Sequence, residues 1–250
     1  MLSTVQVQSI KAKPVQRTCT NCNVRDICLP ADMAQQNLPL MSQFITRTIH
    51  VKRGTRIFSA GQTLHSLYAV RLGVFKTRMM NEHHREQVTG FYMAGALIGA
   101  DALASGRHTY DAIALEDGEV CELSYARIDA QTQSSPAFQA YLYRLMAHEI
   151  NRLHHATLLL RDTAAVQRVV AFLFNLSDEF ALRGYSHKSF LLRMTRNEMA
   201  SYLGLSIETV SRILSRLQSM KLIQMQNRLI ELLDIPELKK TMKGDDCQEN

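Results

Sequence analysis

Three cysteines near the N-terminus have the type and spacing of metal ligands. Cys19, Cys22 and Cys28 form the pattern C-x2-C-x5-C, and the nearest further thiol, Cys121, lies in a strand-like segment much later in the chain. Thiolates are soft ligands, so three close thiols and one distant partner can complete a four-sulfur site. The fifth cysteine, Cys247, lies in the polar tail KGDDCQEN, and we expect it to ligate nothing.

Two kinds of group could occupy a four-thiol site. A structural zinc ion takes four thiolates in a tetrahedron and has no redox chemistry. A 4Fe–4S cluster also takes four thiolates, and its stability depends on how easily oxidants reach it. Spacing does not choose between them, and unpaired thiols in a loose arm are a third alternative. A disulfide framework is not expected, because the N-terminal segment lacks the apolar stretch of a secretion signal and we predict a cytoplasmic protein.

A helix-turn-helix is predicted between Thr195 and Lys221. Thr195 and Glu198 have the spacing of a capping box, in which a hydroxyl and a carboxylate satisfy free amides at the start of a helix. Gly204 can take the left-handed conformation that ends this helix, and Ser206 is a suitable N-cap for the next one. The second helix should bury one apolar stripe, formed by Val210, Ile213, Leu214 and Leu217.

The opposite face of the second helix carries side chains suited to DNA recognition. Glu208, Ser211 and Arg212 lie together there, at positions i, i+3 and i+4. Arg212 can donate two hydrogen bonds to guanine, Glu208 can accept one from cytosine, and Ser211 can reach a base or a phosphate. Two short apolar segments that flank Gln226-Asn227-Arg228 predict a β-hairpin wing. We therefore predict a winged helix-turn-helix that binds double-stranded DNA.

Short strands and glycine turns predict an antiparallel β-roll upstream of this unit. Eight of the eleven glycines fall between Gly54 and Gly118, where they separate strand-like segments. A polar stretch at 81–86 is typical of an exposed hairpin tip, and we expect its two histidines to be solvated because no third ligand is nearby. The apolar, glycine-rich stretch 91–106 could pass close to a ligand or form a tightly packed turn.

A long helix is predicted from Ser135, with Pro136 at its first position, to about Arg161. Its apolar residues repeat every seven positions over three heptads and form an a/d seam. Leu142 and Leu145 lie on an adjacent face that could pack on the roll. A seam beside a second apolar face favours a coiled-coil homodimer over packing within one chain. The predicted seam consists of Tyr143, Met146, Ile150, Leu153, Thr157 and Leu160.

The composition is that of a globular protein with a modest basic excess. The 250 residues carry a net charge of +6, and residues 163–243 hold 12 Lys/Arg against 7 Asp/Glu, which suits contact with phosphates. No apolar run has the length of a membrane span, and no triad, nucleotide loop or carboxylate pair supports catalysis, so we expect neither a membrane protein nor an enzyme. The predicted α+β chain has an N-terminal cysteine arm (1–30), a β-roll sensor domain (31–134), a dimerisation helix (135–161), a winged helix-turn-helix domain (162–243) and a disordered tail (244–250).

This order of elements resembles the CRP/FNR superfamily of bacterial transcription regulators across nearly the whole chain. Within it, the four cysteines and the recognition sequence Glu208-Thr209-Val210-Ser211-Arg212 are most similar to the FNR branch, the oxygen-responsive fumarate and nitrate reduction regulators. The resemblance implies that Cys19, Cys22, Cys28 and Cys121 hold an oxygen-labile 4Fe–4S cluster.

The resemblance also implies the partners of the chain. Glu208, Ser211 and Arg212 would read a palindrome of the TTGAT-N4-ATCAA type when the intact cluster promotes dimerisation without oxygen, and the genes controlled would be those of anaerobic metabolism. The exposed loop near His83–Glu86 corresponds to a region that family members use to contact RNA polymerase.

One departure from the superfamily argues against cyclic-nucleotide binding. Its cyclic-nucleotide sensors need a glutamate for the ribose hydroxyl and an Arg-Ser pair for the cyclic phosphate. Here Ala96 stands where the acid is expected, and Arg107-His108 stands in place of the pair. Two related alternatives stay open, namely a regulator with a structural zinc and one that senses haem or another small molecule in the roll.

Overall fold

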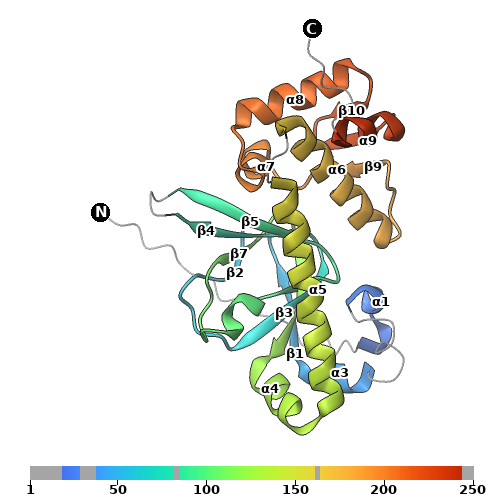
Figure 1. Cartoon of the computed structure of the whole chain (residues 1–250). Coiled ribbons are helices and arrows are strands. Elements are labelled where there is room, and N and C mark those ends of the chain that lie inside the picture. The colour runs from blue at the N-terminus through green and yellow to red at the C-terminus, as the bar shows by residue number, and fades with distance from the viewer. Residues whose placement is uncertain (1–18, 29–37, 82–84, 161–163, 244–250) are drawn as a thin grey trace.

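The computed structural model describes residues 19–28, 38–81, 85–160 and 164–243. Figure 1 shows a β-roll, the long helix α5 (Pro136–Leu160) running beside it, and a C-terminal helical unit at the far end of that helix. The predicted α+β architecture is therefore confirmed. No helix within the described ranges is long and apolar enough to cross a membrane.

The roll consists of two four-stranded antiparallel sheets with a shared core. Their strand orders are β1-β8-β3-β6 and β2-β7-β4-β5. Phe58, Phe75 and Val120 come from different strands and are almost fully buried between the sheets, because alternate side chains of a strand point to the same face. The strands are β1 (Ile45–Val51), β2 (Arg56–Phe58), β3 (Ser66–Leu72), β4 (Phe75–Met80), β5 (Glu86–Tyr92), β6 (Leu97–Ile98), β7 (Asp111–Ala114) and β8 (Gly118–Ser124).

Helical segments from both ends of the roll sequence pack together beside α5. The Phe44 and Phe138 rings lie 5.0 Å apart, and Leu142 and Leu145 join the same apolar cluster, as predicted for that face of the long helix. Helix α4, at the end of the predicted roll segment, was not expected; Ser124 caps its first turn. The segments are the 3-10 helices η1 (Cys19–Asn21) and η2 (Ala100–Leu103), and the helices α1 (Arg25–Cys28), α3 (Leu38–Phe44) and α4 (Tyr125–Ser134).

The C-terminal unit is a winged helix-turn-helix. The two wing strands β10 and β11 pair as predicted, while a third strand, β9, which the sequence did not predict, joins the outer side of β11. Asn227 takes a φ of 57° in the turn between the wing strands. The elements are α6 (Ala165–Leu182), β9 (Ser189–Leu191), α7 (Arg196–Leu203), α8 (Ile207–Ser219), β10 (Ile223–Gln226), β11 (Leu229–Leu232) and α9 (Ile235–Lys243).

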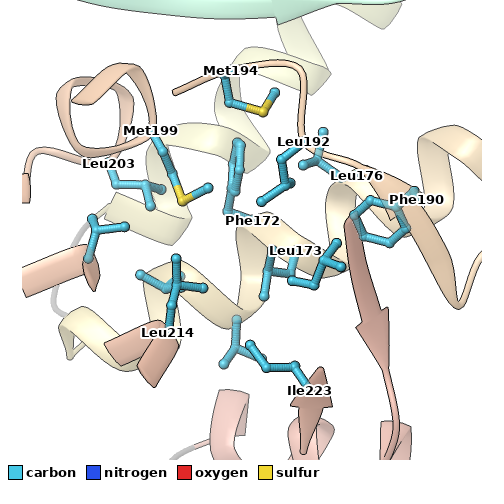
Figure 2. Close-up of a cluster of buried hydrophobic side chains, with 14 of the residues drawn as sticks. Phe172, Leu173, Leu176, Phe190, Leu192, Met194, Met199, Leu203, Leu214 and Ile223 are labelled. Carbon is cyan, nitrogen blue, oxygen red and sulfur yellow. The ribbon is translucent and has the colours of Figure 1, made fainter. Parts of the chain in front are cut away.

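The helix boundaries in this unit follow the predicted caps. The Thr195 hydroxyl accepts from the Glu198 N–H at 3.2 Å, and the Glu198 carboxylate accepts from the Thr195 N–H at 2.7 Å. Gly204 ends α7 with a φ of 64°, and Ser206 caps α8. Figure 2 shows the core beneath these helices, where Phe172, Leu173, Leu214 and Ile223 are labelled among the buried side chains.

Candidate cofactor site and nucleic-acid interface

The arm lies on the roll through its own short helices. Cys19 opens η1, and its N–H donates to the Ser42 hydroxyl of α3 at 3.0 Å. The Cys22 N–H donates to the Cys19 carbonyl at 3.2 Å, which closes the turn between the first two thiols. Cys28 ends α1, and its N–H donates to the Val24 carbonyl at 2.8 Å.

The fourth thiol belongs to the roll itself. Cys121 lies in the middle of β8, where it pairs with Thr48 of β1 and with Ala69 of β3. Cys28 and Cys121 pack against the same apolar cluster, so the end of the arm and the middle of the sheet meet there. All four cysteines are partly exposed, and none of them forms a disulfide.

The four thiols lie close enough to interact electrostatically. Burial, and then the charges of Cys19, Cys121 and Cys22, raise the pKa of Cys28 to about 12. Burial also raises the pKa of Cys19 and of Cys121, although hydrogen bonding by Ser42 opposes the change at Cys19 and Thr48 opposes it at Cys121. Because the raised values keep these three thiols protonated near neutral pH, a metal that binds as a thiolate complex would displace protons.

In the described part of the chain the thiols lie in one region but do not form a compact metal site. Within the described ranges, no three Cys, His, Asp or Glu side chains are gathered tightly enough to hold a metal ion. The structure therefore brings the four predicted ligands into one region without closing them around a single ion.

A glycine allows the arm to approach the roll this closely. Gly95 has a φ of +92°, and a Cβ atom there would lie 2.5 Å from Cγ2 of Ile27 and 3.4 Å from the N atom of Cys28. The segment 91–106 thus forms a tight turn, strand β6 and a 3-10 helix rather than a loose loop. Its apolar, glycine-rich composition was the sequence signal for this close approach.

The same turn contacts the C-terminal unit on its other side. Arg183, at the end of α6, donates from Nε to the Ala94 carbonyl at 2.7 Å, and its guanidinium also holds the Glu179 carboxylate at 2.6 Å. Beside this contact a cavity of about 470 Å³ separates the arm, the roll, α5 and α6; Cys28, Met93 and Leu145 are among its lining residues. No local sequence pattern predicted that Arg183 makes this contact.

The polar face of α8 lies opposite its buried stripe, as predicted. Glu208 and Arg212 are exposed and Ser211 is half-buried, while Val210, Leu214 and Leu217 are buried on the opposite face. Ile213, expected in that buried stripe, is only partly buried at its edge.

Hydrogen bonds orient the polar side chains of this face. The Arg196 guanidinium, from the start of α7, donates to the Ser211 hydroxyl at 3.5 Å. Hydrogen bonds from its own backbone N–H and from Ser206, with the nearby charge of Arg212, lower the pKa of Glu208. Glu208 is therefore ionised at neutral pH and can act as a hydrogen-bond acceptor.

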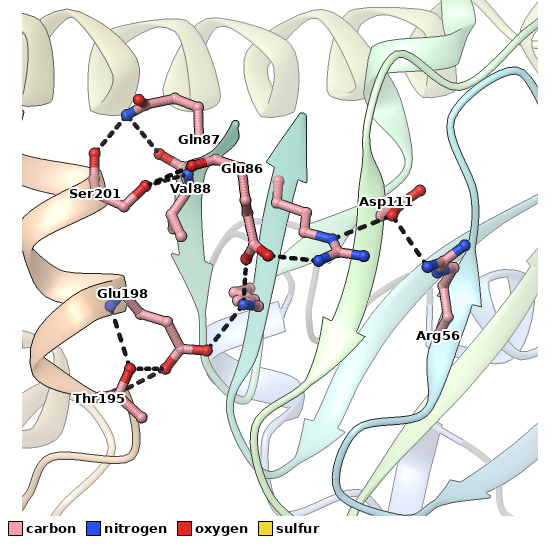
Figure 3. Close-up of polar contacts among 10 residues, drawn as sticks. Arg56, Glu86, Gln87, Val88, Asp111, Thr195, Glu198 and Ser201 are labelled. Atoms are coloured by element: carbon pink, nitrogen blue, oxygen red, sulfur yellow. Dashed lines mark hydrogen bonds and ion pairs between the residues drawn. The ribbon is translucent and has the colours of Figure 1, made fainter. Parts of the chain in front are cut away.

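A buried cation joins the roll to the helix-turn-helix (Figure 3). Lys76 Nζ lies 2.5 Å from Glu86 Oε1 and 2.9 Å from Glu198 Oε1, while its side chain is only 9% exposed. Arg78 extends the network from Glu86 to Asp111. Glu86 was expected in an exposed hairpin tip; it is exposed, but it begins strand β5 instead of lying in the loop.

Backbone contacts run beside this network. The Val88 N–H donates to the Ser201 hydroxyl at 2.9 Å, that hydroxyl contacts the Glu86 carbonyl at 3.3 Å, and Gln87 donates to the Ser201 carbonyl. Helix α7 is thus docked on β5. Residues 82–84, with both histidines of the predicted tip, lie outside the described residues.

The predicted dimer seam is only partly described. Tyr143 and Ile150 are 63% and 51% exposed, and Met146 is partly buried. Large apolar side chains with this exposure on one helix face suit a contact with another helix. The side chains of Leu153, Thr157 and Leu160 lie outside the described part of the chain, as does the tail with Cys247.

Arg107 and His108 both make contacts within the roll. The Arg107 guanidinium donates to the Gly61 carbonyl at 2.8 Å. His108 is buried, stacks on Phe58 with ring centroids 3.7 Å apart, and lies 3.3 Å from the Asp101 carboxylate. These contacts engage the two residues that stand in place of the Arg-Ser pair.

Comparisons with known proteins agree with this architecture. The Crp-like helix-turn-helix domain matches residues 167–241, and the cyclic nucleotide-binding domain matches residues 48–135. Among solved structures, FixK2 from Bradyrhizobium japonicum superimposes with a TM-score of 0.71 at 23% identity, covering 77% of this chain and 95% of that one.

Curated relatives extend the likeness to sequence. The transcriptional regulatory protein btr of Bordetella pertussis is 34% identical over 238 residues, which are 95% of this chain and 98% of the relative. The fumarate and nitrate reduction regulatory proteins of Vibrio cholerae and Escherichia coli are each 37% identical and cover 88% and 86% of this chain, with equal shares of their own lengths. These relatives are transcription regulators and not enzymes. This chain therefore belongs to the CRP/FNR family of DNA-binding transcription regulators.

Proposed function

We propose that this family member responds to oxygen through a 4Fe–4S cluster bound by Cys19, Cys22, Cys28 and Cys121. One observation carries the proposal: the arm folds back so that Cys28, at its end, packs against the same apolar cluster of the roll as Cys121. The 37% identity to regulators named for fumarate and nitrate reduction supports the same assignment.

The donor set fits an iron–sulfur cluster. Four cysteines are its usual ligands. When bound, the cluster would supply an oxidant-sensitive link between the arm and the roll.

The exposed face of α8 would recognise DNA. Arg212 would donate to guanine O6 and N7, Glu208 would accept from the cytosine amino group, and Ser211, already bonded to Arg196, would contact a base or phosphate. A homodimer formed along the Tyr143–Leu160 seam would present two copies of α8 to a palindrome such as TTGAT-N4-ATCAA. The genes controlled would be those of anaerobic metabolism.

The turn at Ala94 and Gly95 connects the two sites. One side of it contacts Ile27 of the arm, and the other accepts the hydrogen bond from Arg183 of α6. Loss of the cluster would release the arm, alter this turn and shift the equilibrium towards a form that binds DNA weakly. RNA polymerase is the proposed protein partner, through the hairpin tip beside Arg85, and the cytoplasm is the proposed location.

Metal analysis of protein purified without oxygen tests this function. We expect about four iron and four sulfide per chain, lost on brief aeration, in the wild type and in Cys247→Ser, with almost none in Cys22→Ser. Roughly one zinc per chain without sulfide would overturn the proposal and make the arm a structural clip.

A further inference from the structure

The hydroxyl of Thr48 is a buried polar group without a regular partner. Thr48 lies in β1 and is 8% exposed, and its Oγ1 atom forms no hydrogen bond to any group that the structure describes. A buried hydroxyl left in this state is unfavourable, because it has given up its hydrogen bonds to water without replacing them. Such a group is expected where a ligand or a changed charge state supplies the missing partner.

The residue across the strand pair from Thr48 is Cys121. The two are register partners in the antiparallel β1–β8 ladder, so their side chains leave the sheet on the same face. The unpartnered Thr48 hydroxyl therefore lies on the same face of the sheet as the Cys121 thiol. A ligating cysteine sulfur carries negative charge and is a strong acceptor, so Cys121 could supply the partner that this hydroxyl lacks.

A second hydroxyl stands beside the first thiol of the arm. Ser42 Oγ accepts the Cys19 N–H at 3.0 Å, which places the Ser42 hydroxyl next to Cys19. Two of the four cysteines therefore have a hydroxyl beside them, each supplied by an element other than the one that carries the cysteine.

We propose that the hydroxyls of Thr48 and Ser42 donate hydrogen bonds to the sulfurs of Cys121 and Cys19 in the cluster-bound protein, and so set its reduction potential and its lifetime in air. This inference rests on the proposed function. A hydrogen bond to a ligating sulfur withdraws negative charge, which stabilises the more reduced state and raises the potential. Partners of metal ligands commonly change metal affinity when they are removed.

The test uses full-length protein purified without oxygen, in wild-type form and as four variants. Thr48→Val removes the hydroxyl and keeps the shape, Thr48→Ser keeps the hydroxyl, and Ser42→Ala removes the second donor. Thr46→Val is the matched control, because that hydroxyl lies on the same strand but donates to the Glu122 carbonyl. Iron and sulfide content, reduction potential, the decay of visible cluster absorbance in air, and the melting temperature of the cluster-free protein are measured for each.

The expected results distinguish an effect on the cluster from an effect on the stability of the fold. Thr48→Val and Ser42→Ala should contain the cluster, have a lower reduction potential, and lose the cluster up to roughly tenfold faster in air. Thr48→Ser and Thr46→Val should match the wild type, and Thr48→Val should melt no lower than the wild type, since its hydroxyl has no partner without the cluster. If Thr48→Val keeps the wild-type potential and decay rate, the inference is wrong while the proposed function stands. A wild-type protein without iron and sulfide would overturn both.

Discussion

Lys76 of the roll and Glu198 of the helix-turn-helix form an ion pair of 2.9 Å. Glu198 is also the capping-box residue of α7, so one carboxylate both starts the first helix of the DNA-binding motif and fixes it to strand β4 (Figure 3). The position of α7 on the roll therefore depends on a charge that comes from the other unit.

Substitution of Lys76 should weaken this docking. Lys76→Met leaves two carboxylates facing each other without their cation, and we expect the free energy of unfolding to fall by about 2–3 kcal/mol, less than for a fully buried pair because Glu86 is a third exposed. Lys240→Met is the control, since its pair with Glu237 is exposed and should contribute almost nothing. Denaturant unfolding measures both, and equal effects would contradict a special role for Lys76.

The same network predicts that the protein loses stability at acidic pH. Burial would raise the pKa of Glu198, but hydrogen bonds and charge from Lys76 and the Thr195 N–H outweigh it, and the pKa is lowered. A lowered folded-state pKa means that the stabilisation is complete above the ordinary glutamate value, about 4.3, and is lost as the pH falls through the folded value. Unfolding free energies between pH 6 and pH 3 should therefore fall more steeply in the wild type than in Glu198→Gln, and parallel curves would refute this.

Gly95 should be intolerant of a side chain for a reason beyond its dihedral angles. Gly95→Ala and Gly61→Ala both place alanine at positive φ, at a strain of roughly 1–2 kcal/mol, but only the Gly95 variant drives a methyl group into Ile27. We expect Gly95→Ala to retain much less iron and to expose the arm to proteolysis, whereas Gly61→Ala should retain wild-type iron. Equal iron in the two variants would show that the arm does not need this contact.

Arg212 should determine one base of the operator. Arg212→Ala is expected to cost about 1–3 kcal/mol of binding free energy on the palindrome and to relax the preference at a single guanine. Binding to a set of single-base operator variants checks this. Uniform weakening across all sequences would instead assign Arg212 to a phosphate.

Ile150 should support the homodimer without supporting the fold of one chain. Its side chain is 51% exposed, so Ile150→Glu removes little buried surface within the chain. In a coiled-coil seam it would oppose two carboxylates across the dimer axis. Sedimentation of the anaerobic variant should show monomers with an unchanged circular dichroism spectrum; dimers as stable as the wild type would contradict the proposed seam.

Local sequence patterns predicted most helices and strands, but they did not predict the contacts between residues far apart in the chain. The capping box at Thr195, the glycine at 204 and the strands of the wing follow from interactions within a few residues, so sequence spacing was sufficient. Lys76 and Glu198 lie far apart in the sequence and meet only where the roll packs on the C-terminal unit, and no periodicity encodes that contact. Strand β9 was missed because three residues are too short to show an alternation.

The candidate cofactor site shows the same division. Spacing identified Cys19, Cys22 and Cys28, and the strand-like surroundings of Cys121 singled out the fourth thiol. The position of Thr48 next to Cys121 could not be predicted from the sequence, because it depends on the register between β1 and β8. The close contact between Gly95 and Ile27 likewise could not be predicted, because it depends on how the arm folds back over the roll.

The affinity of the anaerobic protein for a palindromic duplex, measured before and after exposure to air, tests the central claim most directly. Fluorescence anisotropy with a labelled TTGAT-N4-ATCAA duplex should show binding roughly 5- to 150-fold tighter before air than after it, the span of typical allosteric couplings. Cys22→Ser should bind weakly under both conditions. Equal wild-type affinity before and after air, with the iron shown to be lost, would contradict control of DNA binding by the cluster.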